Sequence, residues 1–298
     1  MMDLTNLRVF VAVVEQGGIV RASRKLHRVP SNITTRIKQL EASVNTQLFH
    51  RHKQRLHLSR SGELLLSYAV KLLRLADEAT CALAGEAPSG TLRLGALEST
   101  AASRLPQVLA EYHNAAPEVK VELITGTNDA LIGAILDRRV DAAFVAEAPP
   151  PGDLASLPLF SERLTLISAM AHPPVRKPKD VAHDSLISFP NGCAYRRRLY
   201  AWLGDSNGAT TKTLDLASYH AMVACVGAGA GVAVVPESVL EIMPLARVQR
   251  HPLPRQHSHL VTPLVWRRNE QSRALAVLVE QLKRRSRAGA AARSARRG

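Results

Sequence analysis

The sequence predicts an α+β multidomain protein, in which a small helical domain, a long helix and a larger two-lobed α/β domain follow one another. Three observations predict this order. Apolar residues recur at helical spacing over residues 1–60 and at seven-residue spacing over residues 65–82, and from residue 91 strand-length and helix-length segments alternate. The length of 298 residues exceeds that of one typical domain.

The net charge of +14 is unevenly distributed. Residues 1–60 carry 11 Lys/Arg and 3 Asp/Glu, residues 61–282 carry 21 and 22, and residues 283–298 carry 7 and none. We expect the first segment to contact a polyanion such as nucleic acid, and the middle segment to form an ordinary near-neutral domain. A basic surface exposed only to solvent would give the same excess of Lys and Arg, so the sequence motifs must decide between this interpretation and nucleic-acid binding.

Cysteine content and hydropathy indicate a cytoplasmic protein. Cys81, Cys193 and Cys225 are odd in number and lack metal-ligand spacing, which excludes a disulfide framework. The chain opens on an amphipathic helix pattern rather than a signal peptide. The longest apolar run, residues 221–235, is short for a membrane span and contains three glycines, so we expect no membrane partner.

The first sixty residues predict a helix-turn-helix followed by a wing. Helices are expected from Leu4 to the glycines at 17–18, over residues 19–26, and from Pro30 onward. The third helix is the predicted DNA reader, because its non-apolar faces carry donors for phosphates and base edges. Residues 47–49 and 55–58 predict the wing strands around a basic turn; the alternative is a hairpin with a charged tip. The predicted DNA-binding residues are Arg21, Ser31, Asn32, Thr34, Thr35, Arg36, Lys38, Arg51, Lys53 and Arg55.

This segment resembles the LysR-type transcriptional regulators. The matching stretches are residues 4–13, 21–27 (RASRKLH), 37–41 (IKQLE) and 47–51 (QLFHR). The resemblance extends to about residue 284 and implies a periplasmic-binding-protein-like (type 2) effector domain, self-association as a dimer or tetramer, and control by a small molecule. The family usually has Ser-Gln-Pro where this chain has Val29-Pro30-Ser31, so a common base-contacting Gln is absent. This departure affects the operator sequence rather than DNA binding.

A heptad seam predicts a linker helix that dimerises. Its apolar positions are spaced alternately by three and four residues, at Leu65, Tyr68, Leu72, Leu75, Ala79 and Ala82. A single amphipathic helix packed on its own domain would show the same pattern. We favour the dimer seam, because helix-turn-helix proteins present two recognition helices to paired half-sites. Residues 86–90 then break the helix and form a hinge.

Two series of alternating strands and helices predict the effector domain. The expected domains are residues 1–59 (winged helix-turn-helix), 60–90 (linker helix and hinge), 91–284 (effector domain) and 285–298 (a disordered basic tail with weak DNA affinity). Lobe 1 is expected over about 91–162 and 266–284, and lobe 2 over about 163–265. Expected elements include one helix over residues 99–113 and a strand over residues 164–169.

Four polar segments follow predicted strands, at residues 98–100, 125–128, 191–197 and 218–220. Ligands of parallel α/β sheets bind at the carboxyl ends of strands, so these segments predict a polar pocket, although Ser99 and Asn128 could equally be helix caps. Glu98 would hold an amine, and Arg196 or Arg197 a carboxylate. The predicted effector-binding residues are Glu98, Ser99, Thr100, Thr125, Gly126, Thr127, Asn128, Tyr195, Arg196, Tyr219 and His220. The resemblance implies effector contacts for Ser99, Thr100, Thr125 and Thr127. We expect no cofactor.

Three rival functions remain. An enzyme is disfavoured because no Gly-x-Ser-x-Gly elbow occurs and because residues 227–231 (GAGAG) follow a helix, the reverse of a dinucleotide loop. We expect no catalytic residue and no metal. A redox-sensing regulator would use Cys193, whose thiol pKa a helix N-terminus would lower, with Cys225 as partner. A constitutive architectural DNA-binding protein would need no effector. RNA polymerase is a further candidate partner of a regulator.

Overall fold

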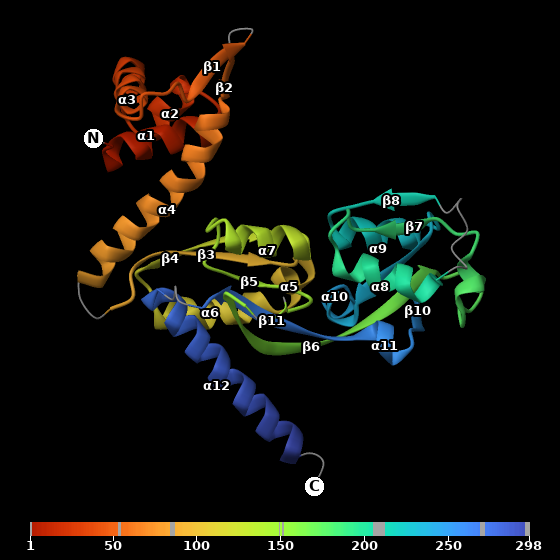
Figure 1. Cartoon of the computed structure of the whole chain (residues 1–298). Helices are drawn as coiled ribbons and strands as arrows, with labels where there is room; N and C mark the ends of the chain where they lie inside the picture. The colour runs from red at the N-terminus through yellow and green to blue at the C-terminus, as the bar shows by residue number, and fades with distance from the viewer. Residues whose placement is uncertain are drawn as a thin grey trace. The chain divides into compact units, whose positions relative to one another are not determined.

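The computed structural model describes residues 2–52, 55–83, 87–148, 150, 152–204, 212–268 and 272–295. The chain divides into two compact units, Met1–Glu86 and Ala87–Gly298. Both can be followed in Figure 1 from the red N-terminus to the blue C-terminus. Each unit has its own hydrophobic core, so each is described by itself.

The N-terminal unit is a winged helix-turn-helix with a long helix attached. Its elements are α1 (Leu4–Glu15), α2 (Ile19–Lys25), α3 (Pro30–Ser43), β1 (Phe49–His52), β2 (Arg55–Leu58) and α4 (Arg60–Leu83). Asp3 caps α1 by accepting the Thr5 N–H, and Pro30 occupies the first turn of α3, where its missing N–H costs nothing. Phe10, Ile33 and Leu40 are fully buried between the helices, as the periodicity predicts.

The wing is anchored to α3 by a glutamate. The Glu41 Oε1 atom accepts the backbone N–H groups of Leu48 (2.8 Å) and Phe49 (3.3 Å). The first wing strand begins at Phe49 rather than at the predicted residue 47, and Leu48 is buried just before it. The two strands pair antiparallel from Phe49 opposite Leu58 to His52 opposite Arg55.

The C-terminal unit is a mixed α/β fold in two lobes joined by long strands (Figure 1). The first lobe contains β3 (Gly90–Ala96), α5 (Glu98–Ser103), α6 (Leu105–Ala115), β4 (Val119–Thr125), α7 (Asn128–Leu136), β5 (Ala142–Phe144) and α12 (Arg273–Ala295). The connecting strands are β6 (Leu154–Ala169) and β11 (His259–Arg267). The second lobe contains η1 (Pro178–Val181), β7 (Leu186–Ser188), α8 (Ala194–Leu203), β8 (Thr213–Asp215), α9 (Tyr219–Gly227), β9 (Val232–Pro236), α10 (Glu237–Glu241), β10 (Val248–Pro252) and α11 (Arg255–Ser258).

Strand pairing places the loops that matter for function. Strand β3 pairs parallel with β4 and β5, and β7 pairs parallel with β8 and β9, whereas β6 pairs antiparallel with β9, β10 and β11. Each lobe therefore has parallel strands whose carboxyl ends lead into helices, the arrangement that builds ligand sites in α/β sheets. The described strands of this unit form one continuous sheet through β6 and β11.

Two predicted elements are wrong because of prolines. The helix expected over residues 99–113 is two helices, α5 and α6, which meet at Arg104. Pro106 lies in the first turn of α6, where it has no N–H to continue a helix from α5. Strand β6 begins at Leu154, ten residues before the predicted start, because Pro158 interrupts the alternation of apolar and polar residues that marks a strand. Pro158 pairs with Pro263 of β11, next to a register irregularity that accommodates both proline rings.

The C-terminal tail also differs from expectation. Disorder was expected over residues 285–298, but α12 continues to Ala295, and residues 296–298 lie outside the described residues. Alanine and arginine have high helix propensities, so a helix already packed in the core continues into this segment. Part of that packing is the hydrogen bond from the Tyr112 hydroxyl of α6 to the Ala274 carbonyl, at 2.9 Å.

His251 in β10 is a buried ring held in its neutral form. The Val175 N–H donates to Nδ1 (3.2 Å), so Nε2 carries the hydrogen and donates to the Ser168 Oγ (2.7 Å). Burial, and secondly the charge of His172, lower the pKa of His251 below its usual value of 6.5. Just below pH 6.5, His251 is protonated in the unfolded chain but stays neutral in the folded one. The stability of the fold that depends on neutral His251 is therefore fully present above pH 6.5 and is lost as the pH falls.

We expect protonation of His251 in the unfolded chain to lower the free energy of unfolding by up to about 1.4 kcal/mol for each pH unit below 6.5. His251→Asn, whose Oδ1 can still accept the Val175 N–H, should show a flatter dependence. Urea denaturation at pH 7.5 and 5.5 measures the difference, with His113→Asn, on an exposed face of α6, as the control. The same pH dependence in all three proteins would contradict the assignment.

Candidate DNA-binding and ligand-binding sites

The outer face of α3 is polar and exposed. Of the predicted DNA-binding residues on it, Ser31, Asn32, Thr35 and Lys38 are exposed, and Gln39 adds a further exposed amide. Ile33, Ile37 and Leu40 hold the opposite face in the core of the unit. The helix therefore presents hydroxyl, amide and ammonium groups to solvent from a fixed backbone, as a reader of the major groove must.

Two predicted readers on α3 are partly engaged within the protein. The Arg36 guanidinium donates to Asn6 Oδ1 on α1 (3.0 Å) and to Asn32 Oδ1 (3.2 Å), and its side chain is half-buried. The Thr34 hydroxyl donates to the Pro30 carbonyl one turn earlier (3.0 Å). Arg36 thus joins α1 to α3 in this structure, a role that the sequence pattern does not indicate.

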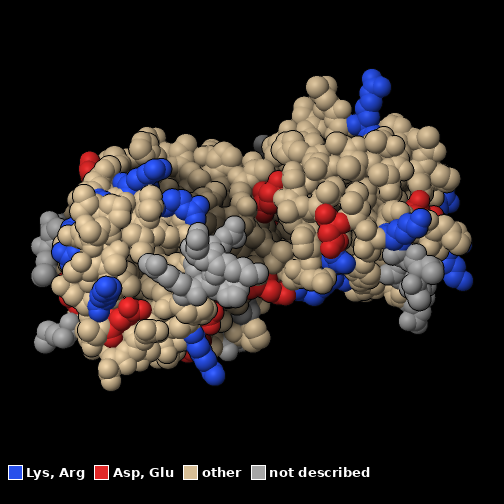
Figure 2. Space-filling model, turned by 90° about the horizontal axis from the view of Figure 1, so that it is seen from above, with Lys and Arg blue, Asp and Glu red and all other residues tan. Residues whose placement is uncertain are grey.

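The remaining predicted DNA contacts lie outside α3. Arg21 on α2 is exposed and donates to the Gly17 carbonyl at 2.9 Å. Lys53 and the side chains of Arg51 and Arg55 lie outside the described part of the chain. On the face shown in Figure 2, the described Lys and Arg side chains are scattered rather than joined in one large patch.

Helix α4 carries an exposed apolar stripe. Leu64, Tyr68, Leu72 and Leu75 are 62%, 54%, 36% and 63% exposed. The predicted seam began at Leu65, but that side chain packs against the core of its own unit, and Leu64 takes its place on the stripe. Ala79 is exposed one turn further on, and the Ala82 side chain lies outside the described residues.

The four polar segments of the C-terminal unit meet in two pairs. In the first pair, the Glu98 Oε1 atom at the start of α5 accepts the Tyr219 N–H at the start of α9, at 3.4 Å. In the second pair, the Asp129 N–H donates to the Gly192 carbonyl, at 3.4 Å. Gly192 has φ +90°, and a Cβ there would lie 2.9 Å from the Thr127 Oγ1, so the lobes touch closely at this point. Strand ends of both lobes therefore face one another.

Buried hydroxyls without partners lie beside the first pair. The Ser99 Oγ, Tyr195 hydroxyl and Thr262 Oγ1 atoms have no hydrogen-bond partner, and their residues are 2%, 3% and 0% exposed. Burial raises the pKa of Tyr195, and the Ser99 and Thr262 hydroxyls lie near enough to lower it by hydrogen-bonding the ionised phenolate. Because buried polar groups are rarely left unpaired, this cluster indicates a place for a ligand or water.

Helix capping does not explain the positions of Ser99 and Asn128. The N-cap of α5 is Leu97, and Ser99 lies inside the first turn. The N-cap of α7 is Thr127, whose hydroxyl accepts the Ala130 N–H. Asn128 is instead buried, and its Oδ1 accepts the N–H groups of the loop after β5 at 3.0 and 3.3 Å.

The other predicted effector contacts differ in exposure. Thr100 is buried beside Ser99, and Tyr219 is buried on α9 with its ring 4.7 Å from that of Phe189. Burial raises the pKa of the Tyr219 hydroxyl well above its usual range. Thr125 and His220 are exposed, and Gly126 is intermediate.

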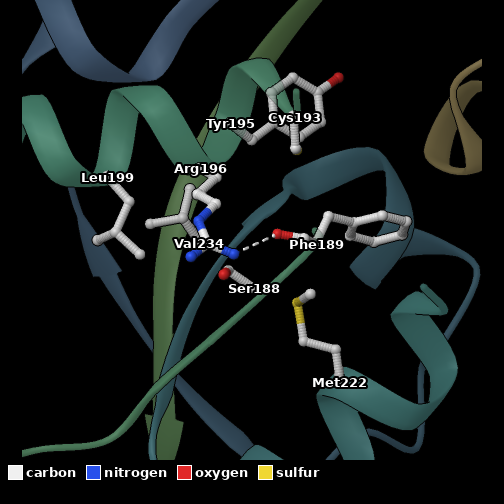
Figure 3. Close-up of a pocket in the computed structure, with 8 residues that line it drawn as sticks. All are labelled: Ser188, Phe189, Cys193, Tyr195, Arg196, Leu199, Met222 and Val234. Atoms are coloured by element: carbon white, nitrogen blue, oxygen red, sulfur yellow. Dashed lines mark hydrogen bonds between the residues drawn. The ribbon is translucent and has the colours of Figure 1, made fainter. Parts of the chain in front are cut away.

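The Arg196 guanidinium lies within the second lobe. It donates to Asp215 Oδ1 (2.6 Å) and to the Phe189 carbonyl (3.0 Å), and Figure 3 shows it pointing toward that carbonyl and Ser188 beneath α8. The enclosed space there is about 10 Å³, close to the least that holds one water molecule. It is lined by Ser188, Phe189, Cys193, Tyr195, Arg196, Leu199, Met222 and Val234. Arg196 therefore fastens β8 to α8 and is not free to bind a carboxylate.

Arg197 and Arg198 reach the first lobe instead. Arg197 donates to both Asp129 carboxylate oxygens (3.2 Å) and to Glu147 Oε2 (3.1 Å), and the Arg198 Nε lies 3.3 Å from Glu147 Oε1. These partly exposed pairs add little stability individually. Together, they hold α8 of the second lobe against the start of α7 and the loop after β5 of the first lobe.

Cys193 is not an activated thiol. It precedes α8 and is buried, and burial raises the pKa of its thiol despite N–H groups of Arg196 and Tyr195 that lower it. The pKa-lowering effect expected of the helix N-terminus is thus outweighed by desolvation. Cys193 and Cys225 are both free thiols.

Sequence reasoning missed several residues of the interlobe contact. Asp129, Glu147 and Gly192 join the lobes, and Thr262 on β11 contributes an unpartnered hydroxyl. The only feature of the sequence that indicates this contact is the Asn191-Gly192 pair, which is typical of a tight turn and lies in a predicted polar segment. Within the described ranges, no three His, Cys, Asp or Glu side chains cluster as metal ligands, and no helix combines the length and apolarity needed to cross a bilayer.

The fold and these sites define a DNA-binding unit attached to a two-lobed ligand-binding unit. Residues 4–63 match the family model for bacterial regulatory helix-turn-helix proteins of the lysR family, and residues 85–287 match that for the LysR substrate binding domain. The chain belongs to the LysR family. It is a LysR-type DNA-binding transcription regulator with an effector-binding domain.

Relatives and solved structures agree with this assignment. The chain is 32% identical over 270 residues to the HTH-type transcriptional regulator GltR of Bacillus subtilis (strain 168), covering 90% of this chain and 91% of that one. It is 36% identical over 241 residues to the regulator YofA of Bacillus velezensis, covering 80% and 82%. Full-length CbnR complexed with its target DNA has the same fold, with a TM-score of 0.69 at 23% identity over 95% of this chain and 99% of that chain. The match to a substrate binding domain does not favour the architectural alternative, and the raised pKa of the Cys193 thiol does not favour the redox-sensing one.

Proposed function

We propose that this regulator binds its operator through α3 and the wing, and that a polar small molecule binds between the two lobes of the C-terminal unit. The proposed DNA contacts are Arg21, Ser31, Asn32, Thr34, Thr35, Lys38, Arg51, Lys53 and Arg55, with Arg36 positioning α3 against α1. The proposed effector contacts are Glu98, Ser99, Thr100, Thr125, Gly126, Thr127, Asn128, Tyr195, Tyr219 and His220, with Arg196 as a positioning residue.

The unpartnered Ser99 and Tyr195 hydroxyls carry this proposal. A buried hydroxyl that makes no hydrogen bond costs about 1–3 kcal/mol, and a bound ligand that pairs with it recovers that cost. Both hydroxyls lie where helix α5 of the first lobe meets helix α8 of the second. A ligand there would bind one arrangement of the lobes better than another, which is the requirement for a conformational response.

The response reaches DNA through self-association. Two chains paired along the α4 stripe would present two recognition helices to half-sites, and a change in packing of the C-terminal units would alter their spacing. A dimer is the smallest assembly with this property, and a tetramer would pair two of them. We place the regulator in the cytoplasm, where operator DNA and RNA polymerase, its further proposed partner, are found.

We expect the full chain to give a sequence-selective gel shift with the DNA upstream of its own gene. A salt series separates specific from electrostatic binding, because purely phosphate-driven binding weakens equally for all sequences as salt rises. Binding that is sequence-blind and lost at moderate salt would contradict the proposed regulator function and restore the architectural alternative.

Two substitutions separate the sites. Lys38→Ala should weaken operator binding by about tenfold, because an exposed ammonium on α3 contacts base edges or phosphates. Thr100→Val should retain operator binding but reduce the response to an effector that is found by screening. Melting temperatures of both variants serve as the folding control. Loss of operator binding by a folded Thr100→Val chain would contradict this division of labour.

A further inference from the structure

We infer that the effector presents a protonated amine to the Glu98 carboxylate, rather than a carboxylate to an arginine. This inference rests on the proposed effector site between the lobes and names the chemistry of its ligand.

One oxygen of the Glu98 carboxylate has no hydrogen-bond partner. Its Oε1 accepts a long hydrogen bond from the Tyr219 N–H (3.4 Å), whereas its Oε2 is buried and has no partner. Burial raises the pKa of Glu98, against the lowering effects of the Tyr219 N–H and of His220. A buried carboxylate oxygen without a donor is costly, and a cationic donor in contact with it both neutralises and hydrogen-bonds it.

The groups around Glu98 suit an ammonium ion. An ammonium has three donors and no acceptor, and the neighbouring Ser99 and Tyr195 hydroxyl oxygens are unpartnered acceptors in the same contact region. The charged neighbour that acts on Glu98 is His220, which is exposed.

The arginines that could hold a carboxylate are already neutralised. Arg196 pairs with Asp215 (2.6 Å), Arg197 with Asp129 and Glu147, and Arg198 with Glu147. An anionic ligand would have to displace one of these carboxylates from its arginine, whereas an amine would donate to the Glu98 Oε2 atom, which has no hydrogen-bond partner. The charge balance of the described site therefore favours a cation.

The test uses matched probes on the full-length protein. Primary alkylammonium ions of two to six carbons are compared with carboxylates and alcohols of the same chain lengths, by thermal shift and then by titration calorimetry. At least one ammonium probe should stabilise the chain while its carboxylate and alcohol counterparts do not. Glu98→Gln should weaken that ammonium binding by about tenfold or more, because it removes the charged partner.

A matched control separates ligand binding from folding. Glu98→Gln keeps an oxygen for the Tyr219 N–H but removes a buried charge, so the unliganded variant should melt at or above the temperature of the native chain. Glu118→Gln removes an exposed carboxylate from the loop before β4 and should leave ammonium binding unchanged. If Glu98 had only a structural role, its substitution would lower the melting temperature and leave the ammonium preference intact.

The outcomes also distinguish this inference from the proposed site itself. If carboxylate or alcohol probes bind in a Thr100-dependent manner and Glu98→Gln does not weaken them, the amine inference is overturned and the interlobe site stands. If no probe of any class gives a shift that Thr100→Val reduces, both the inference and the proposed site are contradicted.

Discussion

A chain in which Tyr68 and Leu75 are both replaced by Glu is expected to be monomeric and to bind its operator about 100-fold or more weakly than the native chain. These two side chains flank Leu72 on the exposed stripe of α4 and are 54% and 63% exposed. Their helix is 24 residues long, which suffices for about three heptads of a two-stranded coiled coil. Four new carboxylates in the paired seam would repel one another, and each monomer would then hold a single half-site.

Sedimentation or light scattering measures the association, and the gel shift measures the operator affinity. Leu136→Glu is the matched control, because Leu136 is an exposed leucine (53%) at the end of α7 in the other unit. It should alter neither quantity. A double-Glu variant that stays dimeric would show that α4 is not the seam, and a monomer with native operator affinity would show that pairing of half-sites is not needed.

The sequence predicted the fold where local pattern and packing agree. The buried faces of α1 and α3, and the bounds of β4, follow directly from apolar spacing. Prediction failed where one residue overrides the pattern, as Pro106 does in dividing the expected helix and Pro158 does in concealing the start of β6. The choice between Leu65 and Leu64 on α4 also required the structure: the heptad spacing selects Leu65, but that side chain packs against the core of its own unit and Leu64 is the exposed one.

The candidate ligand site was predictable in position but not in pairing. The rule for strand ends identified the segments that contain Glu98, Gly192 and Tyr219, because it depends only on the order of strands and helices. Which segments meet depends on how the two lobes close, and this is set by contacts between residues far apart in the sequence. For the same reason, the sequence could not indicate that Arg197 is neutralised by Asp129, 68 residues away.

The largest effect on stability is expected from Gly231→Ala, in the turn between α9 and β9. Gly231 has φ +153°, and a Cβ there would lie 2.2 Å from the Ser185 carbonyl oxygen. That oxygen accepts the Val232 N–H at 2.9 Å, at the start of the β7–β9 pairing. The substitution therefore adds backbone strain to a clash with backbone that cannot rotate away, and should lower the free energy of unfolding by about 3 kcal/mol or more.

Gly229→Ala provides a control two residues earlier in the same turn. Gly229 also has a positive φ, +84°, but a Cβ there meets nothing within 4 Å, so only the conformational cost of about 1–2 kcal/mol is expected. Denaturation followed by tryptophan fluorescence isolates this unit, because both tryptophans, Trp202 and Trp266, belong to it. Equal losses in the two variants would mean that Ser185 moves aside at little cost. The close approach at Gly231 would then not fix the register of β9 against β7, and the two glycines would serve the turn in the same way.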